Sequence, residues 1–306
     1  MAMSIMHNMM AMTASRNLSD AYGSLSTSTR RLSSGLRVGN AADDAAGLAV
    51  REIMRAEISS LNQGVRNAND AISMIQTADG ALGVIDEKLI RMKELAMQAS
   101  TGTYSSDQRL IIDSEYQAMA SEITRIANAT DFNGIHLLNG NVSGANSAHN
   151  GNGLTSSGPV KVHFGTSNDC AEDYYYVSIN TSTASALGLG MGAASKTGTG
   201  AAANAGKSIS TQALAQAALK ALDNAIVSKD KIRANLGALQ NRLSNTITNL
   251  SIQAENTQAA ESQISDVDVA TEMTEFTRTQ ILVQSAVAML SQANNLGRLA
   301  MQLIGG

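Results

Sequence analysis

The sequence predicts a mainly α fold: long antiparallel, coiled-coil-like helices from both chain ends, with a small β-hairpin region in the middle. Apolar residues recur at alternating spacings of three and four in five stretches, which keeps them on one helix face. The single proline, Pro159, stands mid-chain, so no other position carries the residue that costs a helix interior about 3 kcal/mol. Aromatic residues make up 3% and tryptophan is absent, so the core must be largely aliphatic, which suits helix-on-helix packing.

Three helices are predicted before the middle of the chain. The first lies within residues 1–42 and the second runs over about 44–100, with an apolar stripe that begins at Ile58. Gly102 fits the C-cap of the second helix, and residues 105–107 offer an N-cap for the third. The stripe of the first helix consists of Leu18, Tyr22, Leu25, Thr29 and Leu32, and that of the third of Ile112, Tyr116, Met119, Ile123 and Ile126.

The middle of the chain differs in composition from both ends. Residues 141–206 are rich in Gly, Ser, Thr, Ala and Asn. Segments 160–164 and 174–179 combine β-branched and aromatic residues, and residues 165–169 supply turn residues between them. We therefore predict a β-hairpin, after which the chain returns in helices.

Two further helices are predicted after the hairpin. The motif Ser265-x-x-Asp268 reads as a capping box that opens the last helix. The stripe of the fourth helix consists of Leu219, Leu222, Ile226, Leu236, Leu239, Leu243, Ile247 and Leu250. That of the fifth consists of Val269, Met273, Phe276, Gln280, Val283, Val287 and Leu290.

The two ends of the chain are weakly amphipathic and opposite in charge. Residues 1–42 contain four arginines and one acidic residue, whereas residues 261–306 contain five acidic residues and two arginines. Amphipathic helices of opposite charge can pair with each other. A pair of this size leaves apolar surface that other copies of the chain could cover.

The methionines near the start allow two interpretations. Their thioethers could bind a soft metal, but methionine also adapts its shape in protein interfaces, and we expect interface packing. These residues are Met3, Met6, Met9, Met10 and Met12.

The composition argues against several functional classes. The net charge of −4 gives no basic footprint for nucleic acid. The single cysteine, Cys170, is too few for an internal disulfide or a thiolate metal site, and the histidines lack metalloprotease spacing. No apolar run reaches the ~20 residues that a bilayer requires, and no cleavable signal peptide is visible. We therefore expect no enzymatic activity, metal, cofactor or membrane insertion, and place the function in self-association.

Several motifs resemble those of bacterial flagellin. The N-terminal signature is similar at residues 30–37 (RRLSSGLR) and 41–47 (AADDAAG). Further similar motifs are RNAND at 66–70, TADGAL at 77–82, DFNG at 131–134, LLNG at 137–140, LGALQNR at 236–242, TNL at 248–250 and QAN at 292–294. The resemblance covers nearly the whole chain and indicates a minimal form without large outer domains.

This resemblance implies a structural subunit that polymerises into the flagellar filament for swimming. It implies a terminal helical domain of residues 1–42 with 265–306, which lines the inner tube of the filament. The rod domain would comprise residues 43–264, with a variable β/loop region at about 134–206. Export through the flagellar secretion apparatus would place the protein outside the cell. Its partners would be an export chaperone at the C-terminal helix and the filament cap and hook-junction proteins.

Similar flagellins are also detected by a vertebrate Toll-like receptor through the rod domain. The matching positions in this chain are Arg91, Leu95 and Glu115. A surface ion pair between Glu87 and Arg91, with packing of Leu95, explains the same segment without a receptor.

In the filament, apolar residues of both arms are expected to gain partners from neighbouring subunits: Leu18, Leu25, Leu32, Phe276, Val283, Val287 and Leu290. Two other functions remain open. A hook–filament junction protein shares the terminal plan, and a secreted coiled-coil protein would have similar helices but would not polymerise.

Overall fold

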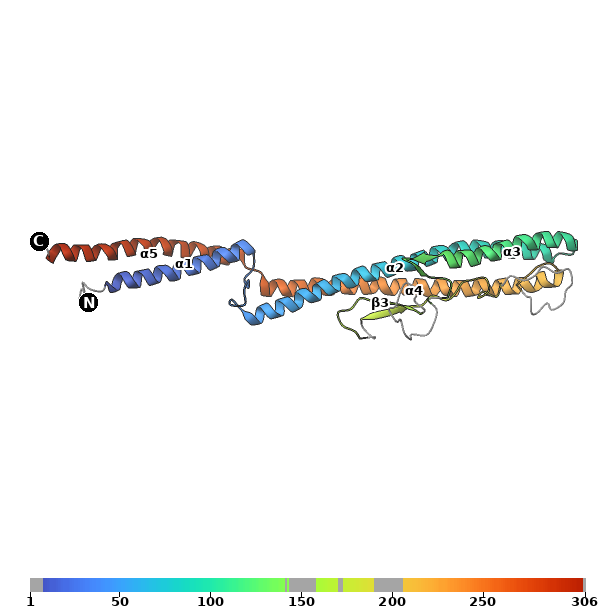
Figure 1. Cartoon of the computed structure of the whole chain (residues 1–306), viewed down its shortest axis with the longest axis horizontal. Helices are drawn as coiled ribbons and strands as arrows, with labels where there is room; N and C mark the ends of the chain where they lie inside the picture. Colours follow the sequence, from blue (N-terminus) through green and yellow to red (C-terminus); the bar gives the residue numbers. More distant parts are fainter. Residues whose placement is uncertain (1–7, 141, 143–157, 170–172, 190–205, 305–306) are drawn as a thin grey trace. The chain divides into compact units, whose positions relative to one another are not determined.

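The computed structural model describes residues 8–140, 142, 158–169, 173–189 and 206–304. In chain order the elements are α1 (Met9–Ser34), α2 (Ala45–Ser100), α3 (Ser106–Ala129), β1 (Asp131–Phe132), β2 (Ile135–His136), β3 (Val160–His163), β4 (Tyr174–Val177), α4 (Gln212–Ser265) and α5 (Val269–Ile304) (Figure 1). The predicted mainly α fold with a central β-hairpin is confirmed.

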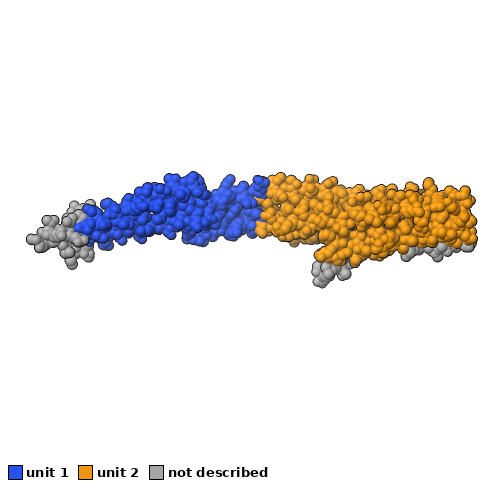
Figure 2. All heavy atoms as spheres, turned by 90° about the horizontal axis from the view of Figure 1, so that it is seen from above, with its two compact units in different colours: residues 1–58, 255–306 blue, residues 59–254 orange. Residues whose placement is uncertain are grey.

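The chain forms two compact units (Figure 2). The terminal unit comprises Met1–Ile58 and Glu255–Gly306, and the central unit comprises Ser59–Ala254. The terminal unit contains α1, α5 and the adjoining ends of α2 and α4, so the boundary falls inside those two long helices. The division expected from the sequence, at residues 42/43 and 264/265, stays a prediction about domains in the assembled protein.

In the terminal unit, α1 and α5 lie side by side and antiparallel (Figure 1). The Asn8 side-chain amide at the start of α1 donates to the Ala293 carbonyl oxygen over 2.9 Å. At the other end, Leu36 forms an antiparallel bridge with Asp266. The first and last helices of the chain are therefore each other's partners, although they are far apart in the sequence.

Local residues explain where these two helices begin and end. The Asn8 side chain accepts from the Ala11 N–H, and Gly35 ends α1 in the left-handed conformation with φ 73°, which favours glycine. The predicted capping box before α5 is wrong in detail. Ser265 is the last residue of α4, and Asp268 caps α5 alone, accepting from the Ala270 N–H at 3.0 Å. With α4 continuing to Ser265, only 266–268 separate the helices.

The end of α2 also differs from the prediction. The helix ends at Ser100, and Gly102 does not adopt the left-handed conformation of a glycine cap. The Arg109 guanidinium of α3 instead donates to the carbonyls of Ala99 and Thr101, at 2.9 and 2.7 Å. A side chain from the next helix thus satisfies carbonyls that a helix end leaves without intrahelical partners.

The core of the protein lies in the central unit, between α2, α3 and α4. It is aliphatic, as the composition predicts, with Tyr116 as the only aromatic residue among its largest fully buried side chains. The Tyr116 hydroxyl donates to the Gly206 carbonyl over 2.8 Å. Other large apolar side chains buried in this core include Leu61, Ile75, Leu82, Ile85, Leu89, Met92, Leu95, Ile123, Leu137 and Leu138.

The β3–β4 hairpin packs on the helices of this unit. Its strands are antiparallel, with Val160 opposite Val177 and His163 opposite Tyr174. A Cβ at Gly64 of α2 would lie 2.0 Å from the Phe164 carbonyl oxygen, so only glycine permits this approach. On α4, the Arg242 guanidinium lies 3.5 Å from the centre of the Tyr175 ring, a cation–π contact.

Candidate self-assembly surface

The terminal unit has almost no apolar core. Among the described side chains, its only buried apolar residues are Val38, Val283 and Ala293, whereas all other buried apolar residues belong to the central unit. Most of the stability of a helix in a protein comes from packing of its apolar face. The α1–α5 pair therefore gains little stability from apolar packing within the chain.

The same unit exposes a large share of apolar surface. Twelve of the eighteen large apolar residues that are exposed within the described part of the chain lie in this smaller unit. They are Met9, Met10, Met12, Tyr22, Val50, Ile53, Val269, Met273, Ile281, Leu282, Val287 and Met289. Contiguous exposed apolar surface of this kind marks an interaction site.

The seven residues expected to mediate assembly occupy different environments. Val283 is 8% exposed, so it is already covered within the chain. Val287, one turn further along α5, is 47% exposed and has surface free for a partner. The half-buried remainder consists of Leu18, Leu25, Leu32, Phe276 and Leu290. Their role in contacts between copies stays a prediction.

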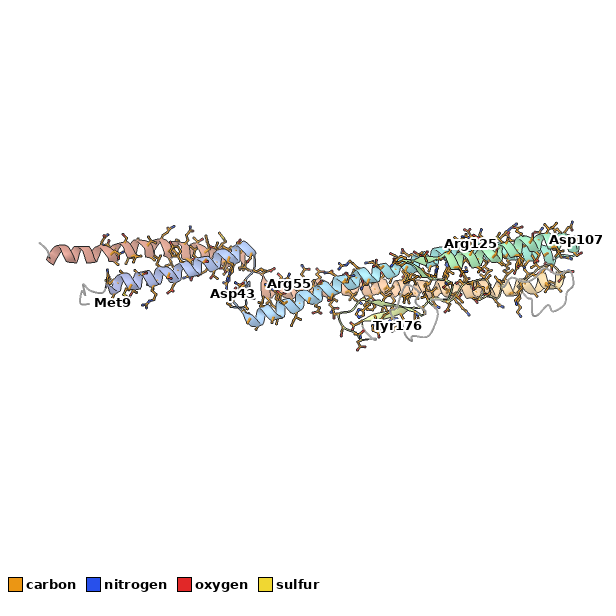
Figure 3. All side chains as sticks on the ribbon, viewed as in Figure 1. Met9, Asp43, Arg55, Asp107, Arg125 and Tyr176 are labelled. Atoms are coloured by element: carbon orange, nitrogen blue, oxygen red, sulfur yellow. The ribbon has the colours of Figure 1, made fainter. Side chains whose placement is uncertain are left out.

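A groove of about 700 Å³ runs along the α1–α5 pair. Its apolar lining includes Met9 and Met10 at the start of α1, where Figure 3 labels Met9, and Leu282 and Met289 of α5. Of the five early methionines expected to pack in an interface, Met9 and Met10 line this groove, Met12 does not, and Met3 and Met6 lie outside the described residues. Leu282 and Met289 do not belong to the apolar stripe predicted for α5. Residues 281–283 are consecutive and apolar, and a helix cannot turn three consecutive side chains to one face. These three consecutive apolar residues therefore indicate a second apolar face on α5.

Among the side chains described, the opposite charges of the two arms meet at one ion pair. Arg31 of α1 lies 3.7 Å from Glu272 of α5. Arg30 instead pairs with Asp43 over 2.9 Å, in the segment that follows α1 (Figure 3), and Glu275 pairs with Arg278 on its own helix. The Arg37 guanidinium donates to the backbone carbonyls of residues 263 and 264. These polar contacts therefore align α1 with α5 at one end of the pair, and the groove along the pair is mostly apolar.

The candidate receptor residues lie in the central unit. The Arg91 guanidinium of α2 pairs with Glu115 of α3 at 2.8 Å and with Glu94 at 3.0 Å, and the hydrogen bonds that it donates to these carboxylates raise the pKa of Arg91. These are its ion-pair partners, in place of the expected Glu87. Leu95 is 2% exposed. The structure thus brings Arg91 and Glu115 together on the surface and packs Leu95 in the core.

The described residues hold neither a candidate metal site nor a candidate membrane-spanning helix. They contain no group of three or more His, Cys, Asp or Glu side chains placed to hold a metal ion. Nor does any of the helices described combine the length and the apolar character that a membrane span requires. His7, His149 and Cys170 lie outside the described residues.

Comparison with known protein families gives two matches that together span most of the chain. Residues 5–143 match the bacterial flagellin N-terminal helical region, and residues 219–304 match the bacterial flagellin C-terminal helical region. The chain belongs to the bacterial flagellin family. Both arms of the terminal unit lie almost wholly within the matched regions of this flagellin.

Known flagellins match over the full length. Flagellin FlaB2 of Treponema pallidum is 40% identical over 302 residues, which cover 99% of this chain and 100% of that one. The flagellar filament 33 kDa core protein of Treponema phagedenis is 41% identical over 302 residues, with the same coverage. The similarity thus spans the whole length of both relatives.

A solved structure from Vibrio parahaemolyticus, assigned as a flagellar hook-associated protein, has the same fold. It aligns with a TM-score of 0.54 and 17% identity, covering 73% of this chain and 100% of that one. Identity this low shows the fold alone. The fold therefore does not separate filament subunits from hook-associated proteins, and the full-length identity to flagellins makes that distinction.

Proposed function

We propose that this flagellin is the structural subunit of a bacterial flagellar filament, and that it polymerises through the α1–α5 pair. The observation that carries the proposal is that the terminal unit, among the side chains described, buries two large apolar residues, Val38 and Val283, and exposes twelve. Burial of apolar surface against other copies would contribute about 25 cal/mol per Å². A contact between two different faces generates a helical polymer when its rotation does not close a ring.

The first experiment is seeded polymerisation followed by negative-stain electron microscopy. Purified subunits are added to sheared filaments, and the full chain is compared with a chain that lacks residues 261–306. We expect long filaments from the full chain alone, because the truncated chain leaves α1 without its partner. Filaments of normal length from the truncated chain would refute assembly through the terminal helices.

A matched pair of point variants localises the contact. Val287 of α5 and Val227 of α4 are 47% and 51% exposed, but the first lies in the terminal unit and the second in the central unit. We expect Val287→Asp to slow filament elongation at least tenfold, since it buries a charge at an apolar contact, whereas Val227→Asp has a smaller effect. Equal effects of the two variants would contradict the assignment.

We also propose the domain division of the filament subunit, with residues 1–42 and 265–306 lining the inner tube and residues 43–264 forming the rod. Of the seven apolar residues from Leu18 to Leu290, the six other than Val283 would then contact neighbouring subunits, and Val283 would pack within the chain. Limited proteolysis tests this division. Both arms should be cleaved quickly in free subunits and resist cleavage in filaments, whereas the helices of the rod should resist in both states. Arms cleaved equally fast in both states would argue against it.

The route to the filament is part of the proposal. We infer that the chain leaves the cell through the flagellar secretion apparatus, and that an export chaperone covers the apolar surface of α5 before assembly. The cap and hook-junction proteins would then contact the filament ends. Ile281 and Leu282 are 57% and 47% exposed and are available to a chaperone. A double Ile281→Ser, Leu282→Ser variant should be exported less, and normal export would sink the chaperone assignment.

Receptor recognition remains a separate proposal. Arg91 and Glu115 would present a paired charge to a vertebrate Toll-like receptor, whereas Leu95 would support that surface from the core. In a reporter-cell assay we expect Arg91→Ala to lose activity. Arg125→Ala is the matched control, because Arg125 is also a surface arginine of the central unit that pairs with a glutamate, Glu122 (Figure 3). Full activity of Arg91→Ala would remove Arg91 from the contact.

A junction protein and a secreted non-polymerising protein are the remaining alternatives. A junction protein would be scarce on the cell, and a non-polymerising protein would stay monomeric when concentrated. Quantifying the subunit in sheared filaments separates these cases from the abundant structural subunit proposed here.

A further inference from the structure

Three methionines lie around the groove between α1 and α5. Met9 and Met10 enter it from α1 and Met289 from α5, and these residues are 63%, 58% and 63% exposed. Oxidation of methionine follows its accessibility. By contrast, Met74 and Met92 in the core of the central unit are 4% and 0% exposed.

We propose that Met9, Met10 and Met289 form an oxidation-sensitive site of the free subunit, at which peroxide converts thioethers to sulfoxides and blocks polymerisation. In the reaction the thioether sulfur attacks one peroxide oxygen and the O–O bond breaks. A sulfoxide forms, and the other oxygen leaves as water after proton transfer. The sulfur is oxidised by two electrons and hydrogen peroxide is reduced. This inference rests on the proposed function, because the groove must be covered by another copy.

The chemistry of the groove explains why oxidation matters there. Around the three methionines the lining is mostly apolar, with Leu282, Ala14, Ala21 and Ala286, and its polar residues are Thr13, Asn17 and Ser285. The Thr13 hydroxyl, also on the groove, already donates to the Met9 carbonyl over 2.9 Å. A sulfoxide is polar, and its oxygen needs hydrogen-bond donors in particular directions. It therefore disrupts methionine-rich interfaces. Covering such groups without matching donors is unfavourable, so the subunit concentration needed for elongation should rise about tenfold or more.

The first measurement is peptide mapping by mass spectrometry after treatment with hydrogen peroxide. In free subunits the peptides that contain Met9, Met10 and Met289 should gain one oxygen per methionine well before those that contain Met74 and Met92. In assembled filaments the same three methionines should be protected. Equal oxidation in subunits and filaments would show that assembly does not cover the groove, and would overturn the proposal.

The second measurement is seeded elongation of treated and untreated subunits. Untreated subunits should elongate, treated subunits should not, and treatment with methionine sulfoxide reductases should restore elongation. If untreated subunits fail to elongate, the filament function itself fails and this inference falls with it. If untreated subunits elongate and fully oxidised subunits elongate equally well, the oxidation-sensitive site is refuted while the filament function stands.

Two triple variants test the position of the site. Met9→Leu, Met10→Leu, Met289→Leu removes the groove thioethers. Met12→Leu, Met97→Leu, Met273→Leu removes three exposed thioethers that do not line the groove. Each variant is compared with its own untreated sample. Peroxide should lose its effect only on the groove variant, and equal peroxide sensitivity of both variants would overturn the assignment.

Discussion

Lys229 in the central unit is a buried lysine, and its effect on the free energy of unfolding depends on its two carboxylate partners. Its side chain is 2% exposed, and its ammonium group lies 2.6 Å from Asp86 and 2.7 Å from Asp230. The two carboxylates remain partly in water, with side chains 29% and 60% exposed. Removing a partner from a buried charge costs more than removing the charge itself from solvated partners.

This asymmetry gives a test at the residue scale. We expect Asp86→Asn to lower the free energy of unfolding by about 1–3 kcal/mol, because the buried ammonium loses a carboxylate. Lys229→Met keeps the packing and leaves two solvated carboxylates, so it should cost less. Urea unfolding of both variants, followed by circular dichroism, measures the difference. A larger loss for Lys229→Met would contradict the argument.

The same lysine predicts a pH dependence. Burial by itself lowers the pKa of Lys229, but the hydrogen bonds that its ammonium group donates to Asp230 and Asp86 outweigh this effect, and the pKa lies above its ordinary value of 10.5. A raised lysine pKa contributes stability that is fully present below the unfolded-state value and is lost as the pH rises through the folded-state value. The stability difference between wild type and Lys229→Met should therefore be constant near neutral pH and shrink above pH 10.5. A constant difference up to strongly alkaline pH would refute this.

Among the helices, three ion pairs join α2 to α4 within the central unit. Asp79 pairs with Arg233 at 2.7 Å, Asp86 with Lys229, and Lys93 with Asp223 at 2.6 Å. The three positions on α2 are seven residues apart. A shift by one heptad would place Lys93 near Lys229, or Asp86 near Asp223, so the order of charges disfavours both neighbouring registers.

A charge exchange tests this role in register. We expect Asp79→Arg to destabilise the central unit because it sets two arginines against each other, and the added change Arg233→Asp to restore stability. The coupling should be about 0.2–1 kcal/mol, since both side chains are largely in water. Thermal unfolding of the two single variants and the double variant measures it. Additive losses in the double variant would mean that the pair does not help to set the register.

The start of α3 provides another test on a single element. The Ser105 hydroxyl accepts from the Gln108 N–H, and the Gln108 side chain accepts from the Ser105 N–H over 2.9 Å. We expect Ser105→Ala to cost about 1 kcal/mol of unfolding free energy, because the cap is lost. Ser106→Ala, one residue later and already helical, is the control. Indistinguishable losses would contradict a specific capping role.

These elements show how far the sequence predicts the fold. The hairpin and the Ser105 cap were predictable because their signals are local: β-branched and aromatic runs around a turn, and a serine three residues before a glutamine. The helix register was not, because an apolar stripe repeats every seven residues and fits several registers equally. The cap of α5 was misplaced because Ser265 and Asp268 have the capping-box pattern, although α4 continues to Ser265.

The candidate site was predicted in part for a similar reason. One apolar stripe on α5 identified Val283, which α5 uses within the chain. An assembly surface needs a second face, and Ile281 and Leu282 lie outside the stripe that was traced. The environment of Leu95 was also beyond the sequence, since a leucine next to charged residues can face either the core or the solvent. Its burial follows from the packing of α2 with the other helices.

At the scale of the whole molecule, the two units differ in what holds them together. The central unit has a continuous apolar cluster, whereas the described part of the terminal unit buries three apolar residues. We expect amide hydrogen exchange in free subunits to be much faster in α1 and α5 than in the central stretches of α2 and α4. In filaments the exchange of α1 and α5 should slow strongly. Similar protection of all four helices in free subunits would count against this reasoning.

The pairing of the first helix with the last also fixes when the terminal unit can form. Asn8 and Ala293, which share a hydrogen bond, are separated by 285 positions. Contacts so distant in sequence form slowly, because a long loop must close first. When the chain leaves a ribosome N-terminus first, or passes through a narrow channel from either end, α1 and α5 meet only after almost everything between them has emerged. A truncated chain therefore has α1 or α5 without its partner. Only the complete polypeptide can form the terminal unit through which the subunit polymerises.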